Sequence, residues 1–165
     1  MHDEIFADLA TLELGEVVAE IGAGYGTTTR WLLARGHRVC AVDIDPAAVA
    51  HLKTALRHFV EAGLLRIIHA PAEAIPLPDS HCDSAVSVAA LHHIRHVEQA
   101  LREMERIAKR LIAVYDWTPE SAGVTNPHNP QELEEKMQEA LAVAQRLGYQ
   151  ITRRWLWYKL LKIHQ

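Results

Sequence analysis

Apolar residues follow two alternating patterns along this chain. Short continuous apolar runs are typical of buried β-strands. They occupy residues 16–21, 38–43, 64–69, 83–89 and 111–117. Between these runs, apolar residues recur every three or four positions, as they do on one face of an α-helix. That spacing covers residues 2–13, 27–36, 45–63, 96–109 and 129–148. Alternation of strands and helices predicts an α/β fold whose largely parallel sheet has helices on both faces.

Residues 149–163 depart from this alternation, because they are rich in aromatic and branched residues. They predict a tight hairpin of two further strands at an antiparallel edge. We therefore expect a Rossmann-like, doubly wound, seven-stranded sheet, mostly parallel with an antiparallel C-terminal hairpin strand.

Length and composition support one domain over residues 1–165. The hydrophobic share of 49% is enough for a proper core, and 23% charged residues is ordinary for a globular chain. Asp3 and Glu4 stand where a signal peptide would be basic and then apolar. No apolar run approaches the length of a membrane span. These features predict a cytoplasmic protein without membrane association.

Charge is unevenly distributed, although the net charge is only −4. No acid follows Glu139, while five basic residues do: Arg146, Arg153, Arg154, Lys159 and Lys162. A basic C-terminal region of this kind binds RNA in some proteins, or forms a homodimer face. A charged edge hairpin that resists aggregation explains the same residues and is favoured.

The candidate chemistry begins at the end of the first strand. An apolar run ends in Glu20 and is followed by Gly22, Gly24 and Gly26. A dinucleotide fingerprint would place its third glycine where Thr27 stands, and a P-loop would need a lysine at the helix start. The loop therefore favours close backbone approach to a ligand over a phosphate cradle.

An acid at the end of the second strand completes this pattern. Asp43 follows Val39–Val42 and stands where open α/β sheets hold an adenosine ribose. With Glu20–Gly26 and the segments 70–79 and 83–93, the chain resembles the class I S-adenosylmethionine-dependent methyltransferases. Within them it is similar to the small-molecule, ubiquinone-biosynthesis type.

This resemblance implies S-adenosyl-L-methionine as the cofactor. It places Asp43 on both ribose hydroxyls and Ile44 against the adenine, while Glu20 either anchors the loop or meets the ammonium through water. Asp45, before Pro46, suits a helix cap instead. Pro71 stands where the family commonly has an adenine-binding aspartate, so that contact falls to Ala72 or Glu73. The implied cofactor residues are Glu20, Gly22, Ala23, Gly24, Gly26, Asp43, Ile44, Ala72, Glu73 and Val88.

Catalytic candidates follow the fourth and fifth strands. His92 or His93 at the mouth of the site is a candidate to orient or deprotonate a nucleophile, and packing or capping explains them equally well. Tyr115, Asp116 and Trp117 end the fifth strand and are substrate-pocket candidates, with plain strand-end packing as the alternative. A metal on His92, His93 and His96 is not expected, because adjacent histidines point in different directions and no Cys or acid completes the set.

The expected reaction is methyl transfer to a small-molecule acceptor. The Asn-Pro-Pro-aromatic motif used for nucleic-acid amines is absent, since Val88-Ala89-Ala90-Leu91 follows strand four. RNA methylation, a catalytically idle cofactor-binding partner subunit and an NAD(P)-dependent oxidoreductase are the alternatives. Few residues remain to cover the substrate, which predicts an open cleft or a lid supplied by a partner.

Overall fold

The computed structural model describes residues 2–164, which form an α/β fold around one seven-stranded sheet. The strand order is β3-β2-β1-β4-β5-β7-β6, in which the β5–β7 and β6–β7 pairs are antiparallel. The predicted fold class is confirmed. The strands are β1 (Val17–Ile21), β2 (Arg38–Asp43), β3 (Leu65–His69), β4 (Cys82–Val88), β5 (Ala108–Trp117), β6 (Gln150–Arg153) and β7 (Trp157–Ile163).

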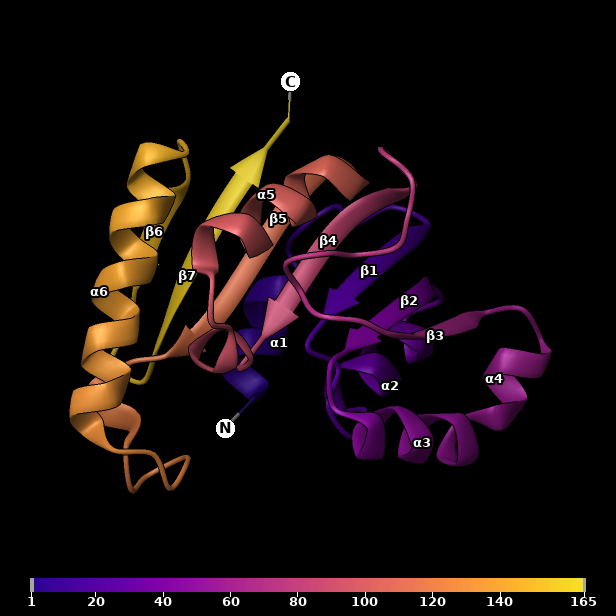
Figure 1. Ribbon diagram of the computed structural model, residues 1–165, viewed down its shortest axis with the longest axis horizontal. Helices are drawn as coiled ribbons and strands as arrows, with labels where there is room; N and C mark the ends of the chain where they lie inside the picture. The colour runs from indigo at the N-terminus through magenta and orange to yellow at the C-terminus, as the bar shows by residue number, and fades with distance from the viewer. Residues whose placement is uncertain (1, 165) are drawn as a thin grey trace.

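Helices cover both faces of this sheet (Figure 1). Apolar side chains of α5 and α6 pack on one face, and those of α1, α2 and α3 pack on the other. No helix within residues 2–164 is long and apolar enough to cross a membrane. The helices are α1 (Asp3–Leu9), α2 (Thr27–Ala34), α3 (Pro46–Ala55), α4 (Arg57–Glu61), α5 (Val97–Ile107) and α6 (Pro130–Arg146), with short 3₁₀ turns η1 (Leu91–His93) and η2 (Pro119–Ser121).

The central position of β1 determines where a ligand can bind. The chain runs from β1 outward through β2 to β3, then returns to place β4 on the other side of β1. Val18 accordingly pairs with Val39 of β2 and with Ser84 of β4. Connections leave β1 and β4 in opposite directions, and such a switch point opens a crevice at the carboxyl ends of the strands.

Several element boundaries differ from the sequence expectation. The first helix, expected over residues 2–13, ends at Leu9. The helix expected over residues 45–63 is interrupted at Leu56, whose dihedral angles (φ −116°, ψ 27°) are not helical. Leu56 buries its side chain there, and a second short helix begins at the next residue. Strand β5 begins at Ala108, three residues earlier than expected, because Ala108 pairs with Cys82. Lys109, which was expected at the end of a helix, and Arg110 thus belong to the strand.

One arginine fixes the proline-rich loop between β3 and β4. Arg106 of α5 donates hydrogen bonds to the carbonyl oxygens of Leu77 (2.7 Å) and Ile75 (2.8 Å). It also forms an ion pair with Asp79 at 3.0 Å. These contacts hold the loop against α5, so that its first residues border the crevice at the carboxyl ends of the strands.

Candidate active site

A cleft of about 550 Å³ lies at the carboxyl ends of β1, β2 and β4. Its walls come from the glycine loop, the end of β2, the β3–β4 loop and the segment after β4. The candidate cofactor residues that line it are Gly22, Gly24, Asp43, Ile44, Ala72 and Glu73. Segments distant in sequence therefore meet at the switch point of the sheet.

The glycine loop is fastened to β2 by its backbone. The N–H groups of Gly22 and Ala23 donate to the carbonyl oxygen of Val42 at 2.8 and 3.1 Å. Gly22 has φ +78°, and a Cβ there would lie 2.3 Å from the Cβ of Ala90. Gly24 has φ +55°, and a Cβ there would meet no protein atom within 4 Å. The loop is tightly packed at Gly22 and leaves room beside Gly24 for a ligand.

Gly26 and Ala23 serve the turn itself and do not line the cleft. Ala23 is buried, and Gly26 begins α2 with φ +100°. A Cβ on Gly26 would lie 2.8 Å from the Arg30 guanidinium. That guanidinium donates to the carbonyl oxygen of Tyr25 at 2.9 Å. These two residues give the loop its shape.

Asp43 presents its carboxylate at the cleft in a fixed orientation. Oδ2 accepts a hydrogen bond from the Gly24 N–H at 2.7 Å, and Oδ1 accepts one from the Asp45 N–H at 2.9 Å. An ionised carboxylate has roughly four acceptor sites, so about two remain for donors in the cleft. Asp45, by contrast, accepts from the Ala47 N–H at 2.9 Å and caps α3, as its position before Pro46 predicts.

The cleft is open to solvent beside Asp43. Ile44 and Tyr25 both line it, and their side chains are 65% and 56% exposed. Two large apolar side chains exposed in one cleft mark a surface that a ligand covers. The open cleft matches the expectation from the few residues outside the sheet.

Glu20 lies below the glycine loop, outside the cleft. Its side chain is buried, and Oε1 accepts a hydrogen bond from the Thr29 hydroxyl of α2 at 2.6 Å. Burial, together with the nearby Asp43 carboxylate, raises the pKa of Glu20 to about 8. Of the two roles considered for Glu20, this geometry matches the anchor that joins β1 to α2 across the loop.

The β3–β4 loop contributes Ala72 and Glu73 to the cleft wall. Glu73 Oε2 accepts from the His96 N–H at 3.2 Å, which ties the loop to the start of α5. Pro71 is not among the cleft residues.

The segment after β4 supplies the opposite wall. Val88 is buried in the core, whereas Ala89 and Ala90 line the cleft. Ala89 has φ +58°, a left-handed conformation that side chains rarely adopt. Its N–H donates to the Tyr115 carbonyl oxygen at 2.8 Å, which holds the strained turn in place.

Replacing Ala89 by glycine should stabilise the fold. Left-handed backbone costs roughly 1–2 kcal/mol for a residue with a Cβ, while glycine adds roughly 0.4–1 kcal/mol of unfolded-state entropy. We expect Ala89→Gly to raise the free energy of unfolding by about 0.5–1 kcal/mol in urea titrations. Ala90→Gly, at negative φ (−122°), is the matched control and should be destabilising. Equal effects of the two substitutions would contradict the strain at Ala89.

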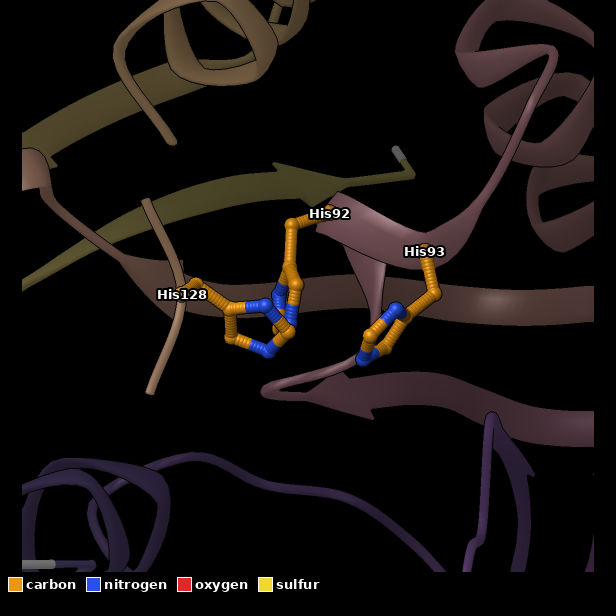
Figure 2. Close-up of side chains that lie close together, drawn as sticks. All are labelled: His92, His93 and His128. Carbon is orange, nitrogen blue, oxygen red and sulfur yellow. The ribbon is translucent and has the colours of Figure 1, made fainter. Parts of the chain in front are cut away.

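Three histidines converge beside this wall. His92 and His93 lie in η1, and His128 comes from the loop before α6 (Figure 2). The ring centroids of His92 and His93 are 4.0 Å apart, and those of His92 and His128 are 4.5 Å apart. One ring nitrogen from each lies within 4.8 Å of the others. The expectation that adjacent histidines diverge is wrong here, because the short 3₁₀ turn directs both rings to one side.

A buried carboxylate orients one of these rings. Asp116 at the end of β5 is 1% exposed, and its Oδ1 accepts from His92 Nδ1 at 2.7 Å. His92 Nε2 then lies 3.1 Å from His128 Nε2. His93 lines the cleft, and burial, followed by the adjacent His92 and His128, lowers its pKa. His96, also named from the sequence, is the exposed N-cap of α5 and stands apart from the described cluster.

Tyr115 does not reach the cleft. Its side chain is buried under α1, and its hydroxyl donates to Asp8 Oδ2 at 2.5 Å. Burial and the Asp8 carboxylate raise the pKa of the hydroxyl far above its usual range. Neighbouring residues of a strand face opposite sides of the sheet. Asp116 therefore points toward His92 while Tyr115 points away from it. Tyr115, the catalytic candidate, thus lies on the face of the sheet that α1 covers.

His128 is the residue that sequence reasoning missed. It follows Asn126, whose Oδ1 accepts from the His128 N–H at 3.0 Å, and precedes Asn129, the N-cap of α6. The turn-forming pair of asparagines around His128 was a visible signal of a fixed loop. Which strand end that loop would approach cannot be read from local sequence.

Comparison with known proteins identifies the family to which this chain belongs. Residues 19–111, more than half of the chain, match the family described as "Methyltransferase domain". The chain belongs to the class I S-adenosylmethionine-dependent methyltransferases. Over 105 residues it is 30% identical to the ubiquinone/menaquinone biosynthesis C-methyltransferase UbiE of Pseudomonas savastanoi pv. phaseolicola, a match covering 62% of this chain and 41% of that one. It thus spans about two fifths of the length of these relatives.

Other relatives share less of the chain or only the fold. A probable ribosomal RNA small subunit methyltransferase A of Haloarcula marismortui is 42% identical over 74 residues, covering 45% of this chain and 26% of the relative. The crystal structure of a SAM-dependent methyltransferase from Aquifex aeolicus superposes with a TM-score of 0.74 at 20% identity, covering 96% and 88% of the two chains. Magnesium protoporphyrin IX methyltransferase from Synechocystis PCC 6803 with bound SAH gives 0.69 at 16% identity, covering 99% and 81%.

Proposed function

We propose that this protein binds S-adenosylmethionine in the cleft and transfers its methyl group to a small-molecule acceptor. The observation that carries the proposal is the Asp43 carboxylate, held by the Gly24 and Asp45 N–H groups at the cleft beside open space at Gly24. A ribose diol offers two hydroxyl donors, and the carboxylate retains acceptor sites for both.

The residues of the cleft suit the chemistry of the cofactor. The room beside Gly24 suits the methionine portion, and the exposed side chain of Ile44 suits the face of an adenine ring. Bound S-adenosylmethionine would supply a methyl carbon on a sulfonium that a nucleophile attacks. The protein mainly has to hold the acceptor in line with that carbon and exclude competing water. Ala89, Ala90 and His93, on the wall after β4, are placed to contact the acceptor.

Two observations support a small molecule as the acceptor. First, four of the five basic residues of the C-terminal region are paired with acids from elsewhere in the chain. The ion pairs are Arg146–Glu98, Arg153–Glu120, Lys159–Asp8 and Lys162–Glu105, at 2.7 to 3.0 Å. Paired charges offer little attraction to a phosphate backbone. Second, the 105-residue match is to enzymes named for quinone biosynthesis.

RNA is the second candidate acceptor, supported by the shorter match to a ribosomal RNA methyltransferase. A transfer assay with methyl-labelled S-adenosylmethionine separates the two. The purified protein is incubated with a small-metabolite extract and, separately, with total RNA. We expect label in the metabolite fraction only. Label in RNA alone would replace the proposed acceptor. Cofactor binding without transfer to either would favour an idle cofactor-binding subunit, and sedimentation of the same sample tests whether the protein forms a homodimer.

A further inference from the structure

The three histidines beside the cleft have the geometry of a metal site. From the positions of their nitrogens, we infer that His92, His93 and His128 bind one divalent transition-metal ion of the zinc type. Their ligand nitrogens lie within 4.8 Å of one another, and those of His92 and His128 are 3.1 Å apart (Figure 2). Tetrahedral zinc with Zn–N bonds of about 2.0–2.1 Å separates two nitrogens by roughly 3.3 Å. One pair is already at that separation.

The third nitrogen reaches the site by a small side-chain movement. Closing the largest separation to the tetrahedral value moves a nitrogen by at most roughly 1.5 Å. His93 is the most exposed of the three histidines, so its side chain has the most room to turn toward the other two. His128 is held from the other side by the Asn126 turn and the start of α6. The site therefore has two fixed ligands and one adjustable one.

Asp116 provides independent support. Its Oδ1 accepts from His92 Nδ1 at 2.7 Å, which fixes the ring and leaves Nε2 to bind a metal. Carboxylate–histidine pairs of this kind accompany most histidine metal ligands. Oδ2 is buried and has no hydrogen-bond partner within residues 2–164. A buried carboxylate with a single hydrogen-bond partner is costly, and a divalent ion on His92 would bring positive charge close to it.

The three imidazole ligands determine which kind of ion the site would bind and how many coordination positions remain open. Imidazole nitrogens suit zinc, copper, nickel and iron, whereas magnesium and calcium prefer oxygen. Three protein ligands are the arrangement of zinc sites that keep a fourth position open. Because His93 also lines the cleft, that position would lie beside the proposed acceptor site. In this role, which rests on the proposed function, the metal would hold acceptors with a hydroxyl or thiol group.

Metal titration of the EDTA-treated full-length protein tests the inference. We expect one equivalent of Zn²⁺ to bind, in competition with a chromophoric chelator, and Co²⁺ to give the visible absorption of a tetrahedral site. His128→Ala should weaken Zn²⁺ binding at least tenfold, and Asp116→Asn should weaken it roughly 10–100-fold. His96→Ala, at an exposed histidine outside the cluster, should leave it unchanged. If His128→Ala unfolds, His93→Ala at an exposed side chain repeats the test.

The inference is overturned if Zn²⁺ shows no saturable binding, or if His96→Ala weakens it as much as His128→Ala does. In the first case Asp116, His92 and His128 form only a hydrogen-bonded chain, with His93 beside it. Calorimetry with S-adenosylmethionine on the same metal-free sample separates this outcome from failure of the proposed function. Cofactor binding without metal binding overturns the metal site alone, and metal binding without cofactor binding overturns only the proposed function.

Discussion

Replacing Glu20 by glutamine should raise the free energy of unfolding at pH 8 by a few kcal/mol. Burial raises the pKa of Glu20 to about 8 in the folded protein, from an ordinary value of 4.5. Between these two values the unfolded chain releases the proton while the folded protein keeps it. The contribution of protonated Glu20 to stability is therefore fully present below pH 4.5, the pKa in the unfolded chain. It is lost as the pH rises toward the pKa of the folded protein, at about 1.4 kcal/mol per pH unit.

Urea titrations at pH 5, 6, 7 and 8 measure this dependence. The wild-type free energy should fall with pH more steeply than that of Glu20→Gln, whose amide oxygen still accepts the Thr29 hydroxyl. Glu13→Gln removes a carboxylate whose side chain is 89% exposed and should leave the wild-type slope unchanged. Parallel slopes for wild type and Glu20→Gln would show that Glu20 ionises normally.

Gly22→Ala should be among the most destabilising single substitutions in the glycine loop. The new Cβ would lie 2.3 Å from that of Ala90, at a residue with φ +78°. Left-handed strain of roughly 1–2 kcal/mol and overpacking of roughly 1–3 kcal/mol together predict a loss of about 2–5 kcal/mol in unfolding free energy.

Gly24→Ala is the matched control, because its φ is also positive but no atom lies within 4 Å of a Cβ. It should lose only about 1–2 kcal/mol of stability, yet weaken cofactor binding because its methyl group enters the cleft. The double variant Gly22→Ala/Ala90→Gly should regain the unfolding free energy lost to overpacking, because the Ala90 Cβ is removed. It should not regain the part lost to left-handed strain. Equal losses for Gly22→Ala and Gly24→Ala in denaturant unfolding would contradict the close contact with Ala90.

Local sequence predicted the parts of this fold that depend on local forces. The apolar run before Glu20 and the cap formed by Asp45 and Pro46 specify their own elements, and both lie where the sequence placed them. The break at Leu56 was not visible, because the same side chain suits a continuous helix and a buried turn. The early start of β5 depends on pairing with Cys82, a contact between distant residues.

The same division applies to the site. Gly22, Gly24, Asp43 and Ile44 were identified because a strand end and its loop are local features, and the sheet topology then brings them together. Tyr115 was misplaced because one residue of strand register decides which face a side chain meets. His128 and His92 are 36 positions apart in the sequence, and their contact depends on the path of the loop that carries His128. Asp116 acquires its partner His92 because η1 packs against the end of β5.

Calorimetric titration of S-adenosylmethionine into the wild-type protein, Asp43→Ala and Asp45→Ser tests cofactor binding in the cleft most directly. Serine keeps the N-cap of α3, so Asp45→Ser controls for the loss of a nearby acid. We expect one site in the wild type, nearly the same affinity in Asp45→Ser, and at least about tenfold weaker binding in Asp43→Ala, the scale of a lost charged hydrogen bond. If Asp43→Ala bound S-adenosylmethionine as tightly as the wild type, or if the wild type bound NAD(P) and not S-adenosylmethionine, the proposed cofactor site would be contradicted.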